Sequence, residues 1–202
     1  MKRRAAGLLL LFGASVQAAE PVCVDSAGEL ASWEGPRAGS ARSLRREFDF
    51  AKLAGCLRQD GATRRLLRVS LGEFLPPVAL TIEAVARREG VLAPEVRVFD
   101  RNGEEIARHG FDAFRQRGAD FAHTLFLNDD AARDGYLLIG NDPANAGGSG
   151  KLVSGNRYAT PIITPLVIAH YSNGYESRRE LPYRDAGLVR VQMQAAEQRV
   201  LP

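Results

Sequence analysis

The feature that most constrains the fold is a series of short segments in which apolar and polar residues alternate, with no long segment that repeats at the 3.6-residue period of a helix. The alternating segments are 46–50, 66–71, 78–85, 96–99, 124–127 and 188–193. Residues 136–140 form a continuous apolar run, which is typical of a strand buried on both faces. Seven or eight short strands predict an all-β fold, an antiparallel β-sandwich of jelly-roll-like type.

Residues with turn chemistry separate these segments. Asp100-Arg101-Asn102-Gly103 follows one segment with an Asn-Gly pair suited to a tight reversal, and Asn128-Asp129-Asp130 ends another. Residues 112–116 are expected to form one helical turn, and 194–200 a short terminal helix or a frayed tail. The stretch 141–187 is expected to be a long loop region between the last strands.

The first 18 residues are typical of a secretory signal peptide. Three basic residues at 2–4 precede the apolar run 5–12, and Val16 and Ala18 occupy the −3 and −1 positions of a cleavage site. The apolar run is shorter than the roughly 20 residues that span a bilayer. We therefore expect cleavage after Ala18, export to the periplasm and no stable membrane insertion. Residues 19–202 are expected to form a single β-sandwich domain.

The charge balance argues against a nucleic-acid partner. Of the 27 Lys and Arg residues, three lie in the first 18 residues, which hold none of the 24 Asp and Glu, so the rest of the chain carries equal numbers of basic and acidic residues. Its paired arginines are isolated from one another, whereas nucleic-acid binding normally needs a concentrated basic surface. The sequence predicts no nucleic-acid binding.

Cys23 and Cys56 are the two cysteines, and an oxidising compartment makes their pairing the default. In the chain-entropy model, a bridge closing a loop of this length contributes about 3.5–4 kcal/mol. It would staple the N-terminal segment 19–45, which is poor in large apolar residues, to the body of the domain. The alternative, a redox-active thiol, lacks a closely spaced cysteine pair or a nucleophile context.

Catalytic, nucleotide and metal motifs are incomplete. Residues 145–152 look like a phosphate loop but have Asn145 where the pattern needs Gly and Leu152 where it needs Ser or Thr. The serines lie in no Gly-x-Ser-x-Gly elbow. His109, His123 and His170 lack the spacing of a zinc site. We therefore predict no enzyme, no cofactor and no metal.

The stretch 141–187 holds four of the ten prolines and four of the five tyrosines, and loops held by a rigid sandwich commonly carry binding groups. Tyrosine rings could stack on sugar faces while amides and carboxylates bond hydroxyls, and the same rings could instead pack the loop onto the sandwich. The candidate ligand-binding residues are Tyr158, Tyr171, Tyr175, Asn173 and Asp142. His170 is expected to be a structural residue that fixes the approach to the last strand.

Several segments resemble the maltose operon periplasmic protein family. The resemblance covers roughly 23–193 and rests on Val91–Asp100 before its turn, 48–50, 75–76, 136–139, 165–170 and the N-terminal pieces 23–26 and 29–30. It implies a β-rich periplasmic protein linked to carbohydrate uptake, with no established catalytic residues to carry over. The chain differs by the extra sequence 175–185 and by ending at Pro202, without a Pro/Ala-rich linker and helical C-terminal region.

Sequence and resemblance together predict a non-enzymatic periplasmic accessory protein associated with uptake of maltose or maltodextrin-type carbohydrate. One alternative is a β-sandwich envelope module that binds a partner protein or a glycan polymer. Another is a hydrolase whose site residues are dispersed in the sequence. A concave pocket with a paired nucleophile and base would favour the hydrolase.

Overall fold

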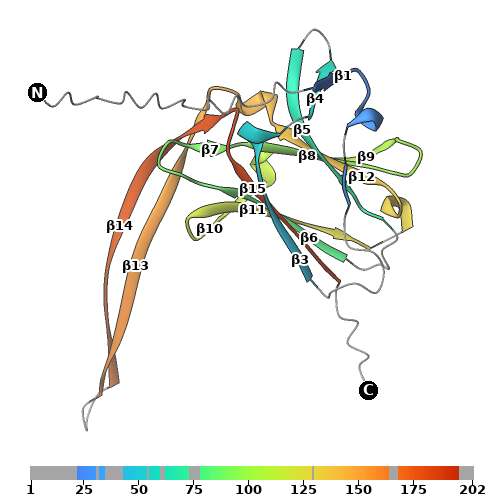
Figure 1. Cartoon of the computed structure of the whole chain (residues 1–202). Helices are drawn as coiled ribbons and strands as arrows, with labels where there is room; N and C mark the ends of the chain where they lie inside the picture. Colours follow the sequence, from blue (N-terminus) through green and yellow to red (C-terminus); the bar gives the residue numbers. More distant parts are fainter. Residues whose placement is uncertain are drawn as a thin grey trace, which may run out of the picture.

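The computed structural model describes residues 22–30, 32–34, 43–53, 55–59, 62–72, 78–128, 130–163 and 168–195. Strands dominate this part of the chain (Figure 1). The helical elements in it are short 3-10 turns: η1 (Ala27–Glu29), η2 (Phe50–Lys52), η3 (Phe111–Ala113), η4 (Asp130–Ala132) and η5 (Pro143–Asn145). None of these described helices is long and apolar enough to cross a membrane. The predicted signal peptide, residues 1–18, lies outside the described residues.

The strands form two packed sheets and one smaller sheet. Sheet I runs in the order β1 (Val22–Val24), β4 (Gly55–Gln59), β5 (Ala62–Ser70), β12 (Tyr136–Asn141), β8 (Pro94–Phe99) and β9 (Glu105–His109), with β2 (Ser32–Glu34) also paired to β5. Sheet II runs β10 (Arg115–Arg117), β11 (Asp120–Leu127), β6 (Val78–Val85), β15 (Leu188–Ala195) and β3 (Ser43–Asp49). The small sheet consists of β13 (Ser149–Ile163), β14 (Ile168–Arg184) and β7 (Val91–Leu92).

Eight of these strands follow the jelly-roll order. When β3, β5, β6, β8, β9, β11, β12 and β15 are lettered B to I along the chain, sheet II contains B-I-D-G and sheet I contains C-H-E-F. All neighbours within these two sets are antiparallel. The predicted antiparallel β-sandwich with jelly-roll connections is therefore confirmed.

Alternating side chains fill the space between the sheets. In β6, Val78, Leu80, Ile82 and Ala84 are buried and the residues between them are half-buried. They join residues of β5, β8, β12 and β15 in one apolar core. Because successive side chains of a strand point to opposite faces, the alternation in the sequence becomes the inside and outside of the sandwich.

Strand β12 is buried on both faces, as its continuous apolar sequence predicted. Leu137 and Ile139 belong to the main core, whereas Leu138 packs on the outer face of sheet I with Leu30 and Phe99. Position 140 next to them requires glycine, because the Cβ atom of any other residue would lie 2.3 Å from Cδ2 of Leu66. The outer face of sheet I thus carries a second, smaller core beneath the N-terminal segment.

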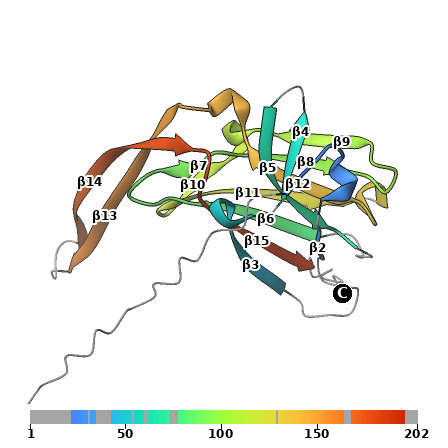
Figure 2. The same cartoon turned by 45° about the horizontal axis from the view of Figure 1, so that its top comes forward.

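The expectation of a long loop over 141–187 is wrong for most of that stretch. Residues 149–163 and 168–184 form a long antiparallel hairpin, paired from Ser149↔Pro182 to Ile163↔Ile168. Leu152 and Leu181 are buried at its base, and β14 ends in parallel pairing with β7. Beyond this base the hairpin extends away from the sandwich (Figures 1 and 2). A two-stranded arm has no core beneath it, so its sequence lacks the alternation that marks the other strands.

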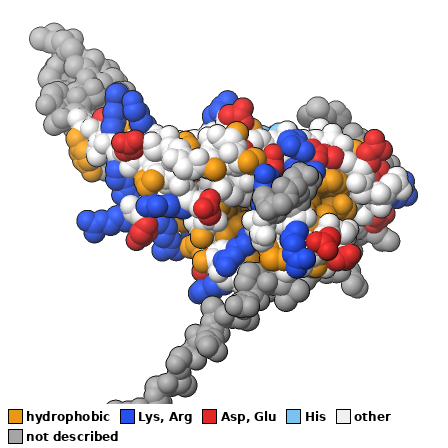
Figure 3. All heavy atoms as spheres, turned by 90° about the horizontal axis from the view of Figure 1, so that it is seen from above, with side chains coloured by type: hydrophobic (Ala, Val, Ile, Leu, Met, Phe, Trp, Pro, Cys, Tyr) orange, Lys and Arg blue, Asp and Glu red, His pale blue; other side chains and the backbone are white. Residues whose placement is uncertain are grey.

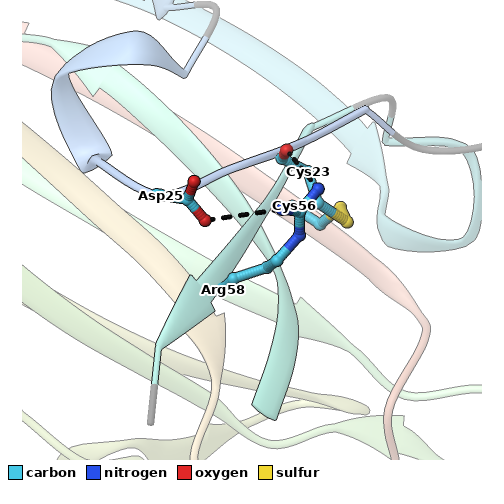
Figure 4. Close-up of a disulfide and its surroundings, with 4 residues drawn as sticks. All are labelled: Cys23, Asp25, Cys56 and Arg58. Carbon is cyan, nitrogen blue, oxygen red and sulfur yellow. Dashed lines mark hydrogen bonds and ion pairs between the residues drawn. A yellow bond between two sulfur atoms is a disulfide. The ribbon is translucent and has the colours of Figure 1, made fainter. Parts of the chain in front are cut away.

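The predicted disulfide is present between Cys23 and Cys56. The two residues are register partners in the parallel pair of β1 and β4. Arg58 reinforces the attachment by donating a hydrogen bond to the carbonyl oxygen of Cys23 (3.1 Å) and pairing with Asp25 (3.6 Å; Figure 4). The N-terminal segment is therefore joined to the edge of sheet I by a covalent bond, a short ladder and an ion pair.

Replacing both cysteines by serine is expected to release residues 22–30 while the two-sheet core stays folded. The loss of unfolding free energy should be about 3–4 kcal/mol, because the bridge closes a loop of 33 residues. Urea unfolding gives the free energy, and hydrogen exchange at residues 22–30 and in β6 shows which part opens. Equal loss of protection in β6 and in the N-terminal segment would contradict the prediction.

Candidate functional site

The outer face of sheet I has a cavity of about 560 Å³ where the N-terminal segment meets the hairpin of β8 and β9. Its lining comes from segments far apart in the sequence: Asp25, Ser26, Ala27, Gly28, Leu57, Arg97, Phe99, Arg101, Asn102, Gly103, Tyr136 and Leu138. Its volume lies in the range of small-molecule sites. We take this cavity, called the outer cavity below, as the candidate functional site.

A stack of rings and guanidinium groups forms one wall of the outer cavity. The rings of Phe99 and Tyr136 are stacked with centres 4.8 Å apart and an interplanar angle of 7°. Arg68 lies over Tyr136 (4.5 Å) and Arg97 over Phe99 (5.0 Å). Because cation–π contacts and stacking hold these rings, the wall is rigid, and the ring faces that the arginines cover are not open to a ligand.

A cluster of ionised side chains fixes Arg97 beside this wall. Glu105 accepts a hydrogen bond from Nε of Arg97 (2.7 Å) and another from Nε of Arg108 (2.7 Å). The bond from Arg108 is the largest cause that lowers the pKa of Glu105, to about 2, and Arg97 adds to the effect. Glu105 is therefore ionised at neutral pH, and the outer cavity keeps a charged wall.

The predicted turn at 100–103 forms the rim on the β8–β9 side. Asp100 accepts hydrogen bonds from the backbone N–H groups of Asn102 (2.9 Å) and Glu104 (2.8 Å), and Gly103 has φ +82°. These bonds, led by the one from Glu104, lower the pKa of Asp100. The turn is thus pre-organised and presents Arg101 and Asn102 at the rim. Within the described part of the chain, Arg101 has no ion-pair partner.

The opposite rim is the stapled N-terminal segment. Ser26 begins η1 and accepts a hydrogen bond from the backbone N–H of Gly28 (3.3 Å). Asp25 is largely exposed and pairs with Arg58 beside the disulfide (Figure 4). The bond between Cys23 and Cys56 helps to hold this rim by keeping β1 against β4.

The structure places four of the five predicted ligand residues on the hairpin, away from the outer cavity. The register pairs Tyr158 with Asn173, and Thr160 with Tyr171, while Tyr175 pairs with Asn156. Because paired positions share a face and every second position repeats it, positions 158, 171, 173 and 175 lie on one face of the ladder. Tyr175 is 67% exposed. The side chains of Tyr158, Tyr171, Asn173 and His170 lie outside the described part of the structure.

The prediction for Asp142 is a contact with sugar hydroxyl groups, whereas in the structure its carboxylate bonds to groups of the protein. It is only 5% exposed, and its carboxylate accepts hydrogen bonds from the backbone of Phe111 (2.8 Å) and Ala144 (2.9 Å) and from Nδ2 of Asn145 (2.9 Å). Asp142 is the N-cap of η5 and also anchors the start of η3. An Asp before a Pro-x-Asn turn is typical of a capping residue, and that signal was present in the sequence.

Sequence patterns alone did not assign the residues of the outer cavity to a site. Arg97, Phe99 and Tyr136 lie on two neighbouring strands, and Asn102 was recognised only as a turn residue. Their convergence depends on the pairing of β8 with β12, which no local motif encodes. The surface in Figure 3 shows basic and acidic side chains interspersed, in agreement with the balanced charge of the sequence.

Comparison with known proteins finds no family model, no curated protein and no solved structure that matches this chain.

Replacing Asp142 by alanine is expected to lower the free energy of unfolding by about 1–3 kcal/mol, because the N–H of Phe111 is left buried without its acceptor. Asp185→Ala is a matched control: Asp185 accepts a bond from Asn141 at an exposed site, and its loss should change the free energy by less than about 0.5 kcal/mol. Urea unfolding of both variants measures the difference. Equal effects would show that Asp142 has no special structural role.

Proposed function

We propose that this protein is a non-enzymatic, exported accessory protein that binds oligosaccharide of the maltodextrin type in the outer cavity. The observation that carries the proposal is the convergence of Asp25, Arg101, Asn102 and Tyr136 around a cavity of about 560 Å³. Jelly-roll sandwiches also occur among lectins, which is an analogy of fold only.

The chemistry of this rim suits a sugar. Neighbouring hydroxyl groups of a sugar both donate and accept hydrogen bonds, and the rim offers a carboxylate, an amide and a guanidinium group that match both roles. Nδ2 of Asn102 already donates to Asp100 (3.0 Å), which orients the amide and leaves its oxygen available as an acceptor. The rim therefore supplies donors and acceptors in fixed positions.

The same geometry argues for weak binding. The stacked faces of Phe99 and Tyr136 are covered by each other and by arginines, so a sugar gains hydrogen bonds but little ring stacking. An open site with limited burial favours a dissociation constant near 1 mM, about −4 kcal/mol. Weak binding suits a protein that meets abundant carbohydrate during uptake.

The ionisation and pairing of Glu105 and the capping role of Ser26 support a function without catalysis. A general acid or base works best when its pKa lies near the working pH, whereas Glu105 has a pKa of about 2 and is fully paired with arginines. The Ser26 hydroxyl group caps η1. These groups hold the walls of the outer cavity in place.

Titration of the mature protein with maltotriose and maltoheptaose tests the proposal by NMR. We expect amide shift changes at residues 25–28, 97–103 and 136–138, with a dissociation constant in the millimolar range. Arg101→Ala and Asn102→Ala should each weaken binding about three- to tenfold, because each removes one hydrogen-bonding group.

Arg178→Ala is the matched control, since Arg178 is an exposed arginine on the hairpin that pairs with Glu176. It should leave the affinity unchanged. Shift changes confined to the hairpin, or none at about 10 mM sugar (about −2.7 kcal/mol), would remove the outer cavity as the sugar site.

A second candidate function, docking of a partner protein of the envelope, is favoured by the hairpin. Residues 158–175 contain no Asp, Glu, Lys or Arg, whereas the hairpin nearer the sandwich carries Lys151, Glu176, Arg178 and other charged residues. The exposed Tyr175 lies at the boundary. An arm that extends from a folded body and loses its charges toward the end is suited to insertion between apolar surfaces of a partner.

A photo-crosslinking amino acid in place of Tyr175 is expected to give a discrete adduct with an envelope protein in living cells. The same amino acid in place of Arg117, an exposed position of β10, is the control and should give none. Adducts of the same mass from both positions would indicate non-specific collision and would contradict docking through the hairpin.

A further inference from the structure

Two histidines from different sheets face each other at the open edge of the sandwich. His109 is the last residue of β9, at the end of sheet I, and His123 lies in β11 of sheet II. Their ring centres are 4.8 Å apart. Both line a cavity of about 500 Å³ that also contacts Thr124, Asn128 and the exposed Phe126. This cavity, called the edge cavity below, is distinct from the outer cavity.

His123 has an unpartnered ring nitrogen. Its Nε2 atom is buried and has no hydrogen-bond partner among the described residues. The ring also hydrogen-bonds to the backbone of Ala113. Metal-binding histidines commonly have this arrangement, with one nitrogen donating to a carbonyl group and the other facing the ion.

The surroundings hold this imidazole in place. Phe114 packs against His123 with ring centres 5.5 Å apart, and Phe114 is itself buried. Ala113 ends η3, whose first backbone N–H is bonded to the buried carboxylate of Asp142. The carbonyl group that orients His123 is thus fixed by a cap and by aromatic packing.

In the described part of the chain, no third His, Cys, Asp or Glu joins the pair as a possible ligand.

We propose that His109 and His123 form a binding site for a divalent transition-metal ion, Cu²⁺ in preference to Zn²⁺, with water or an outside ligand in the remaining positions. Two imidazoles that bind one ion at about 2.0–2.1 Å, with an angle of about 90–110° between them, have ring centres about 4.5–5.2 Å apart. The observed 4.8 Å lies inside that range.

The donor set selects the metal class. Two imidazoles with no carboxylate in the lining favour Cu²⁺ over Zn²⁺ and exclude Ca²⁺ and Mg²⁺, which prefer oxygen ligands. Two protein ligands give an exchangeable site, because nothing in the lining balances the charge of the ion.

Titration of the untagged, disulfide-intact mature protein with Cu²⁺ tests the proposal. The expected result is one equivalent bound, with an electron paramagnetic resonance spectrum that shows two imidazole nitrogens. His109→Asn should weaken the binding at least about tenfold, since even loss of an outer partner of a metal ligand costs that much. His170→Asn removes the third histidine and should leave both affinity and spectrum unchanged.

A second measurement covers the case in which His109→Asn perturbs folding. Diamagnetic Zn²⁺ added to the wild-type protein should shift the imidazole proton resonances of His109 and His123 together and leave those of His170 in place. A spectrum with one imidazole nitrogen or none, equal weakening by the His170 variant, or Zn²⁺ shifts confined to His170 would overturn the proposal.

Discussion

The burial of β12 on both faces is the constraint on which the other features depend. Its inner side chains, Leu137 and Ile139, fill the space between the two sheets, and this requirement fixes the register with β5 and β8. The same strand then presents Leu138 outward, and an apolar residue there needs cover. The N-terminal segment supplies Leu30 as cover. A three-residue strand cannot hold itself there, so the bond between Cys23 and Cys56 makes the second core, and with it the outer cavity, possible.

The alternation of apolar and polar residues predicted the strands that pack on the core. The expectation of an oxidising compartment predicted the disulfide. Segments such as 78–85 and 188–193 are strands because one face is buried. The hairpin of β13 and β14 was missed, since 151, 153–155 and 174–180, the exposed part of its described side chains, leave no periodic signal. The short β1 and β2 were missed for a similar reason: they are held by pairing and by the disulfide instead of by a long apolar pattern.

The candidate sites show where sequence reasoning ends. A concentration of tyrosines in 141–187 is a true property of the chain, but composition cannot distinguish an extended arm from the wall of a pocket. The sequence alone does not show whether Asp142 bonds a ligand or caps a turn. Its burial and its three hydrogen bonds to the protein identify it as a cap. His109 and His123 come together because β9 ends sheet I close to β11, the strand of sheet II next to the short end strand β10, and their spacing in sequence does not reveal this.

The two cavities share strand β8 and lie on opposite sides of it. Val98 faces the edge cavity, and the next residue, Phe99, faces the outer cavity. The pairing of β8 with β9 shifts its register between these two residues, as in a β-bulge. A bulge increases the local twist and re-aims the side chains on either side of it. The local geometry at Val98 and Phe99 therefore sets the wall of each cavity. A substitution that removed the register shift would alter both cavities, even if the substituted residue contacted no ligand.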